Sequence, residues 1–143
     1  MPEGSGRADK RRPEDRPVVR EAFPYLCVRG AADAIDFYRD VFGATERLRM
    51  NRDDGGVAHA ELAFGPTLFM ISDEYPQMDI HGPLHWGGTA VRFHLHVNDV
   101  DGLAQRAQKA GATALRGPRD EAHGERQCLL RDPWGHEWLL GDG

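Results

Sequence analysis

The chain has few cysteines, no long apolar run and no basic stripe apart from its first twenty residues. Two cysteines occur in 143 residues, and neither Cys27 nor Cys128 has a second Cys or a His at metal-finger spacing, so we expect buried free thiols. No apolar segment suits a membrane helix or a signal peptide, which predicts a cytoplasmic protein with no membrane partner. A net charge of -5 without a basic stripe argues against nucleic acid and favours small-molecule or protein partners.

What the sequence does contain is an internal repeat of about 69 positions. The first copy runs from Val28 to Gly43-Ala44-Thr45 and the second from Val97 to Gly111-Ala112-Thr113. One module of this size cannot bury both faces of its sheet and helix, so two modules are expected to complete one core. We divide the chain into a disordered tail over residues 1–19 and a single domain over 20–143. Within that domain, module 1 covers about 22–72, a linker covers 73–90 and module 2 covers about 91–141.

The hydrophobic pattern of module 1 predicts a strand, a helix and three further strands. The strands are expected at 23–28, 45–50, 56–64 and 67–71, and the helix at 31–42, where apolar residues form one wide stripe ended by Gly43. Module 2 repeats this order, with strands near 91–97, 113–116, 125–131 and 136–140. Its helix follows a cap at Asn98 or Asp99 and stops at Gly111. Asp132-Pro133-Trp134-Gly135 has the residues of a type I turn.

Five short motifs stand in order along this duplicated frame: FYRDVFGATE (37–46), HAELAFG (59–65), VNDVDGL (97–103), AGAT (110–113) and GERQCLLRDPWGHEW (124–138). Together they resemble the glyoxalase, bleomycin-resistance and dioxygenase superfamily, also called the vicinal oxygen chelate fold, and most of all its PhnB-like branch. The resemblance implies an α+β fold in which two tandem βαβββ modules form a curved, cup-shaped mixed sheet with helices outside. It also implies a homodimer, since cups in this superfamily are commonly completed across a two-fold interface.

In metal-dependent members, inward side chains from the first and fourth strands of each module hold a divalent ion, usually through His, Gln or Glu. The matching positions here are Phe23, Arg92 and Leu139, with the fourth near Met70. Phenylalanine, arginine and leucine cannot coordinate a hard divalent cation. We therefore expect no metal at the usual position and no cofactor.

A divalent metal on rearranged ligands is the alternative. Arg92, His94 and His96 share one face of their strand, as do His59 and Glu61. Glu61, His94 and His96 would then form a facial triad for iron or zinc, although Arg92 raises the positive potential beside it. Such a site would make the protein a metal-dependent lyase, isomerase or dioxygenase.

The favoured interpretation is a metal-independent protein that binds an antibiotic-like small molecule, partly aromatic or anionic. Trp86, with His81 and His85 on the linker, either closes over this ligand or packs at a subunit seam. Glu137 is expected to be a solvated rim charge, Trp134 and Trp138 to serve packing, and no residue is assigned to catalysis. The expected ligand-binding residues are Phe23, Tyr25, Glu61, Met70, Trp86, Arg92, His94 and Leu139.

Overall fold

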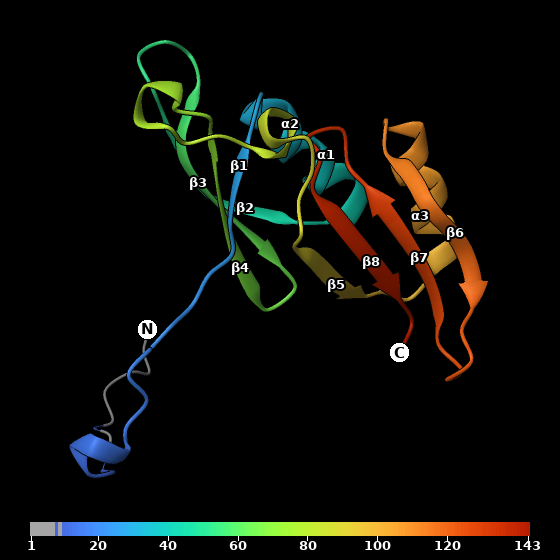
Figure 1. Cartoon of the computed structure of the whole chain (residues 1–143), viewed down its shortest axis with the longest axis horizontal. Helices are drawn as coiled ribbons and strands as arrows, with labels where there is room; N and C mark the ends of the chain where they lie inside the picture. Colours follow the sequence, from blue (N-terminus) through green and yellow to red (C-terminus); the bar gives the residue numbers. More distant parts are fainter. Residues whose placement is uncertain (1–7, 9) are drawn as a thin grey trace.

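The computed structural model of the chain describes residue 8 and residues 10–143. Two βαβββ modules follow one another along the chain (Figure 1). The first contains β1 (Tyr25–Val28), α1 (Ala31–Phe42), β2 (Thr45–Asn51), β3 (Val57–Phe64) and β4 (Thr67–Asp73). The second contains β5 (Arg92–His96), α3 (Val100–Lys109), β6 (Thr113–Asp120), β7 (Arg126–Arg131) and β8 (Glu137–Gly141). Short helices η1 (Pro13–Asp15), η2 (Pro76–Met78) and α2 (Pro83–Trp86) lie outside the two modules.

Each module builds its own four-stranded mixed sheet, in the orders β1-β4-β3-β2 and β5-β8-β7-β6. The first and last strands of each module pair in parallel, and the other neighbours pair antiparallel. Tyr25 stands opposite Met70 in the first sheet, and His94 stands opposite Leu139 in the second. The same number of positions separates Tyr25 from His94 and Met70 from Leu139. Equivalent residues of the two modules therefore pair in the same register. These observations confirm the predicted α+β fold of tandem modules.

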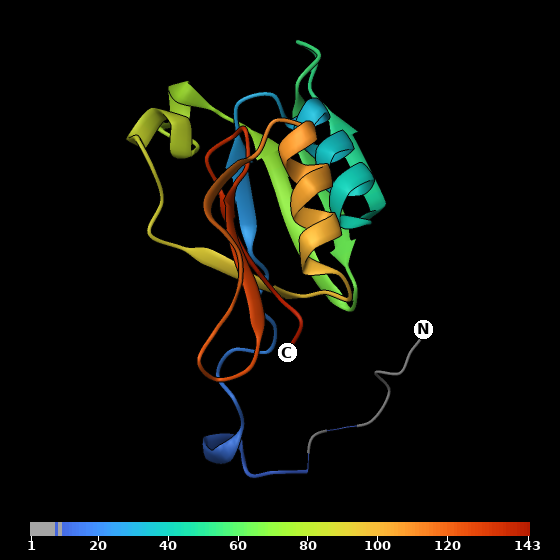
Figure 2. The same cartoon turned by 90° about the vertical axis from the view of Figure 1, so that its right-hand side faces the viewer.

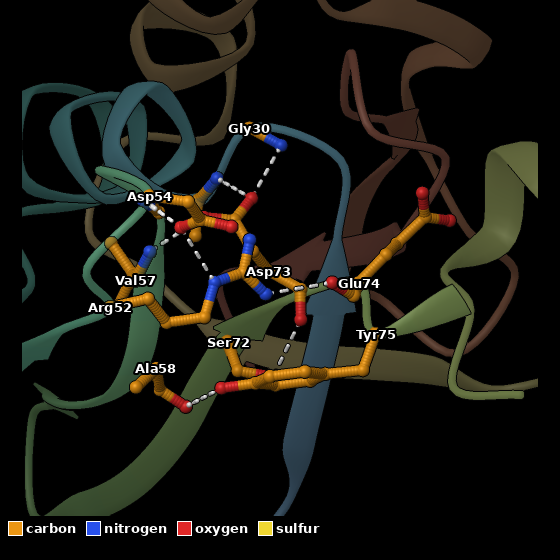
Figure 3. Close-up of polar contacts among 11 residues, drawn as sticks. Gly30, Arg52, Asp54, Val57, Ala58, Ser72, Asp73, Glu74 and Tyr75 are labelled. Carbon is orange, nitrogen blue, oxygen red and sulfur yellow. Dashed lines mark hydrogen bonds and ion pairs between the residues drawn. The ribbon is translucent and has the colours of Figure 1, made fainter. Parts of the chain in front are cut away.

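The helix α1 forms where the apolar stripe predicted it, and Asp73 at the end of β4 caps its N-terminus. Gly30 precedes the helix and has no side chain to cap it. Asp73 Oδ1 accepts the backbone N–H groups of Gly30 and Ala31, both at 2.8 Å, while its Oδ2 accepts that of Val57 at 2.8 Å (Figure 3). One carboxylate thus joins the start of the helix to two strands, and it supplies the acceptor that an N-cap residue normally provides.

The two modules share one core through an aromatic seam. The indole of Trp138 on β8 is fully buried and stacks near Phe64 and Phe69 of module 1 at ring-centroid distances of 5.4 and 5.8 Å. Phe93 on β5 meets Phe69 at 5.1 Å. The two long helices lie side by side, as Figure 2 shows. Because these rings come from both halves of the chain, neither module has a complete core alone.

A buried carboxylate, that of Asp132, also links the two modules at this seam. Asp132, only 4% exposed, follows β7 and accepts hydrogen bonds from the Tyr38 hydroxyl of α1 and from the Trp138 indole N–H, the latter at 2.9 Å. Its second oxygen accepts the backbone N–H groups of Trp134 and His136 at 2.9 and 3.0 Å. The predicted turn is present, since the Gly135 N–H bonds to the Asp132 carbonyl at 3.0 Å. Asp132 therefore supports both the turn and the contact between modules.

The structure corrects several predicted boundaries. The first strand begins at Tyr25, so Phe23 precedes it and is 39% exposed. The strand β6 continues to Asp120 through two register shifts, because irregular pairing with β7 accommodates Gly117-Pro118. Of the two proposed caps for α3, Asp99 is the one whose carboxylate accepts the Gly102 N–H, at 3.0 Å. Residues 1–7 and 9 of the predicted tail lie outside the described residues.

The segment between the modules is anchored at one end and exposed at the other. The Gly82 N–H donates to Glu74 Oε2 at 2.9 Å, and a Cβ at Gly82 would lie 2.5 Å from the Cys27 carbonyl oxygen. The next residue, Pro83, is buried, whereas Trp86 at the end of α2 is 63% exposed. No helix in the described part of the chain is long and apolar enough to cross a membrane.

Candidate functional site

Each sheet has one face packed on the helices and one face turned away from them, which we call the open face. Burial alternates along β1, where Leu26 and Val28 are buried while Tyr25 and Cys27 are not. Exposure alternates in the same way along β5, and the register with β8 then assigns Glu137, Leu139 and Gly141 to the same face as Arg92, His94 and His96. The open-face residues from the predicted site are Tyr25, Glu61 and Met70 on the first sheet and Arg92, His94 and Leu139 on the second.

A chain of three polar side chains lies on the open face of the first sheet. The Tyr25 hydroxyl is 2.9 Å from His59 Nδ1, and His59 Nε2 is 3.1 Å from Glu61 Oε2. Burial raises the pKa of Tyr25, so the phenol stays protonated at neutral pH. An imidazole between a hydroxyl and a carboxylate is an arrangement that can pass a proton. Because Glu61 bonds to His59, its carboxylate already has a partner on the first sheet.

Two arginines share one carboxylate on the open face of the second sheet. Arg92 Nε lies 3.2 Å from Glu137 Oε1, and an Arg131 guanidinium nitrogen lies 3.3 Å from Glu137 Oε2. The predicted role of Glu137 as a solvated rim charge is wrong, because the residue is only 6% exposed and paired on both sides. Two positive groups for one negative group leave an excess positive charge here, and the Arg92 side chain is 61% exposed.

A cavity of about 560 Å³ lies between the β3–β4 hairpin and β5. This volume is within the range of small-molecule sites. Arg92, His94 and His96 from the second sheet contribute polar groups to its wall. Aromatic rings supply much of the rest, namely Phe42, Phe64, Phe69 and Phe93. The cavity therefore combines flat apolar surface with a partly exposed guanidinium.

A smaller cavity of about 210 Å³ lies beside β1 and the linker. Tyr25, Cys27, His81 and Trp86 are among its lining residues. Burial, with the charge of Glu74, raises the pKa of Cys27 to about 11, so its thiol is not a nucleophile at neutral pH. Cys27 is partly rather than fully buried, whereas Cys128 is buried as expected; both are free thiols. Phe23, Glu61, Met70 and Leu139 line neither cavity.

The residues considered for a rearranged metal site are only partly brought together. His94 and His96 are neighbours, with ring centroids 4.8 Å apart. Their carboxylate companion is Glu125, and the ligating atoms of these three residues lie within 4.8 Å of one another. The metal site considered from the sequence used Glu61 as its carboxylate. Glu61 instead lies on the first sheet, where it bonds to His59. Glu125 lies far from both histidines in sequence, just before β7, so no local pattern indicated it.

The side chains at the usual metal positions do not suit a divalent ion. Phe23 precedes the sheet and offers no donor atom. Arg92 carries a positive charge and is held by Glu137, and Leu139 stands between His94 and Leu129 in the register. Metal sites need oxygen, nitrogen or thiolate donors, and these three side chains provide none that can coordinate an ion. The residues at these positions therefore do not fit a metal.

Comparison with known proteins gives the family. A model of the Glyoxalase/Bleomycin resistance protein/Dioxygenase superfamily matches residues 19–140. This chain belongs to that superfamily. An uncharacterized Mycobacterium bovis protein, Mb0911c, is 43% identical over 121 residues, covering 82% of this chain and 80% of its own. The Mycobacterium tuberculosis protein Rv0887c is equally similar, with 71% of its length covered.

Several solved structures have the same fold. TioX from Micromonospora sp. ML1 is 29% identical, with a TM-score of 0.64 over 85% of this chain and 98% of that one. A Bacillus cereus PhnB protein, described as a putative 3-demethylubiquinone-9 3-methyltransferase, has a TM-score of 0.70 at 18% identity, with 85% and 98% covered. The fosfomycin resistance protein FosX from Mesorhizobium loti has a TM-score of 0.64 at 17% identity, with 89% and 94% covered. At 18% identity, the likeness to the PhnB protein shows a shared fold.

Proposed function

We propose that this protein binds a small molecule with an aromatic part and an anionic group, without a metal at the usual position of its superfamily. The observation that carries the proposal is the shared carboxylate of Glu137, which leaves Arg92 and Arg131 with one negative charge between them. A ligand carboxylate, sulfonate or phosphate would complete the pairing through a charge-assisted hydrogen bond.

The cavity beside Arg92 supports the aromatic part of the ligand. Rings from α1, β3, β4 and β5 line it, and flat apolar surface of this kind binds planar groups. The family description includes bleomycin resistance proteins, which supports an antibiotic-like compound as the ligand class. The predicted site residues remain part of this proposal, with Arg92 and His94 at the large cavity and Tyr25 and Trp86 at the small one.

An aromatic sulfonate tests the proposal directly. We expect 8-anilinonaphthalene-1-sulfonate to bind the folded protein, and Arg92→Met to weaken this binding by about 1.5–3 kcal/mol, the contribution of a hydrogen bond to a charged group. N-phenyl-1-naphthylamine, which lacks the sulfonate, should bind both proteins equally. Fluorescence titration gives the dissociation constants.

Arg131→Met removes the other partner of Glu137 and should also weaken binding of the sulfonate, because Glu137 then neutralises Arg92 alone. Glu137 keeps one arginine in either variant, so little loss of stability is expected in both. An Arg92→Met protein that binds the sulfonate normally but melts early would show that Arg92 is structural. Failure of the wild-type protein to bind the sulfonate would also overturn the proposal.

A further inference from the structure

The histidine-rich end of β5 has the composition of a transition-metal site that differs from the usual site of the superfamily. His94 and His96 project from the same open face, two residues apart on an edge strand. Glu125 approaches them from just before β7, with its Oε1 3.3 Å from His94 Nε2. In the part of the chain that the structure describes, this is the one group of three such side chains close enough to hold an ion.

The spacing of the donor atoms suits a small divalent ion. Zinc bonds nitrogen and oxygen ligands at about 2.0–2.2 Å, so two ligands of a tetrahedral site lie roughly 3.4 Å apart. His94 and Glu125 already have this separation. The exposed imidazole of His96 needs only a side-chain rotation to join them, since all three ligating atoms lie within 4.8 Å.

Glycine at position 141 keeps the site open. Gly141 faces His96 across the β5–β8 pair, where a side chain would point to the open face. A Cβ there would overlap the Glu125 carboxylate and lie 2.9 Å from His94 Nε2. The missing side chain therefore makes the space in which the carboxylate and the imidazole meet.

Glu125 is also held ready to coordinate. Its Oε1 accepts a hydrogen bond from the Gln127 side chain at 2.7 Å, and its side chain is 11% exposed. The Gln127 bond, and then the charges of His94, His96 and His123, lower the pKa of Glu125. Other carboxylates of this sheet pair with arginine, as Glu121 does with Arg116 and Arg119. The ion-pair partner of Glu125 is a histidine, which can exchange a proton for a metal ion.

We propose that His94, His96 and Glu125 bind one divalent ion of the zinc, nickel or cobalt class. Borderline-soft ions of this kind favour imidazole ligands, whereas magnesium and calcium favour oxygen. Three protein ligands leave a coordination position open to solvent, on the side of the cavity that His94 and His96 line. This site shares His94 and the large cavity with the proposed ligand site but does not use Arg92, so metal binding does not rest on the proposed function.

Titration of the untagged full-length protein tests the site. After treatment with a chelator and dialysis, we expect one equivalent of Zn²⁺ to bind in calorimetry, and Co²⁺ to give the visible absorption of a site with imidazole ligands. Even changes to outer-shell partners cost metal sites about 10–100-fold in affinity, so His96→Ala and Glu125→Gln should each cost at least that much. His96 is exposed, so its loss leaves the fold intact.

His59→Ala and His85→Ala are the controls. The first removes the histidine of the other histidine–carboxylate pair, and the second removes a histidine that stacks on His81 in the linker. Both variants should bind Zn²⁺ as the wild-type protein does. Absence of Zn²⁺ binding would overturn the site, as would equal loss of Zn²⁺ affinity in His59→Ala and His96→Ala. Arg92→Met should keep the metal, which separates this outcome from the anion-binding test.

Discussion

At the scale of single residues, Asp132 shows how much a buried carboxylate can organise. The motif around it predicted a turn, and the turn is present, but its side chain also joins α1 to β8 through Tyr38 and Trp138. Burial of the Tyr38 hydroxyl beside this carboxylate raises its pKa well above the ordinary value. A local turn pattern cannot reveal such a partner, because Tyr38 lies in the other module.

We expect Asp132→Ala to lower the free energy of unfolding by about 3 kcal/mol or more, since it leaves the buried Tyr38 and Trp138 donors without their acceptor. Urea denaturation followed by tryptophan fluorescence measures the loss. Asp101→Ala is the control: it removes a carboxylate that pairs with Arg126 at the surface, where solvent screens the pair and little stability is lost. Equal losses in the two variants would contradict the role assigned to Asp132.

On the second sheet, too, a charged residue has a partner that is distant in the sequence. Arg92 has an anionic partner in Glu137, which lies directly opposite it in the register. The parallel pairing of β5 with β8 brings these residues together. Sequence reasoning placed both residues on their strands but did not align the strands, so Glu137 was assigned to the rim.

At the scale of elements, the helices were predicted more accurately than the strands. The predicted bounds of α1 agree with the structure because an apolar stripe and Gly43, at φ 72°, mark its length and its end. The strand β1 is two residues shorter than predicted, because pairing with β4 decides where a strand begins and periodicity alone does not. Asp73 caps α1 from the end of β4, which the pairing of β1 with β4 brings near. No residue just before α1 therefore indicated this cap.

The anchor of the linker gives a prediction on pH. Glu74 accepts hydrogen bonds from Arg29 and from the Gly82 N–H, both at 2.9 Å, and the Arg29 contact is the main cause that lowers its pKa below the usual 4.5. A carboxyl group whose pKa is lower in the folded protein stabilises it above the unfolded value and loses this effect as the pH falls.

Glu74→Gln should therefore reduce stability by up to about 1 kcal/mol at pH 7, a small amount because Arg29 is largely exposed, and the difference from wild type should shrink toward pH 3. Thermal melts across this pH range give the comparison. Glu21→Gln, in the exposed segment before β1, serves as the control and should follow wild type throughout. A constant difference at all pH values would contradict the role of the Glu74 charge.

At the scale of the whole molecule, apolar side chains on the open face and linker remain exposed in a single chain. Trp86, Tyr25, Met50 and Leu48 are between 41% and 63% exposed. Apolar surface that is concentrated in this way commonly marks an interface. The homodimer expected from the sequence would cover it, with the linker reaching the second copy.

Sedimentation at micromolar concentration should then give a species of twice the 16.0 kDa chain. Trp86→Ser should shift the equilibrium toward the monomer because it removes a large exposed ring from the linker. Leu115→Ser, at a 38% exposed position of β6, is the matched control and should leave the dimer intact. A wild-type protein that sediments only at 16 kDa would rule out the homodimer.

The repeat in register also shows at which equivalent positions the two modules differ. Positions that face the helices have kept their chemistry, as Leu26 matches Leu95 and Ile71 matches Leu140 at the same spacing. Positions on the open face have changed, with Tyr25, Cys27 and Ser72 matched by His94, His96 and Gly141. The shared aromatic seam restricts change on one side of each sheet and permits it on the other. Two modules of the same fold can therefore present two different surfaces while they share one core.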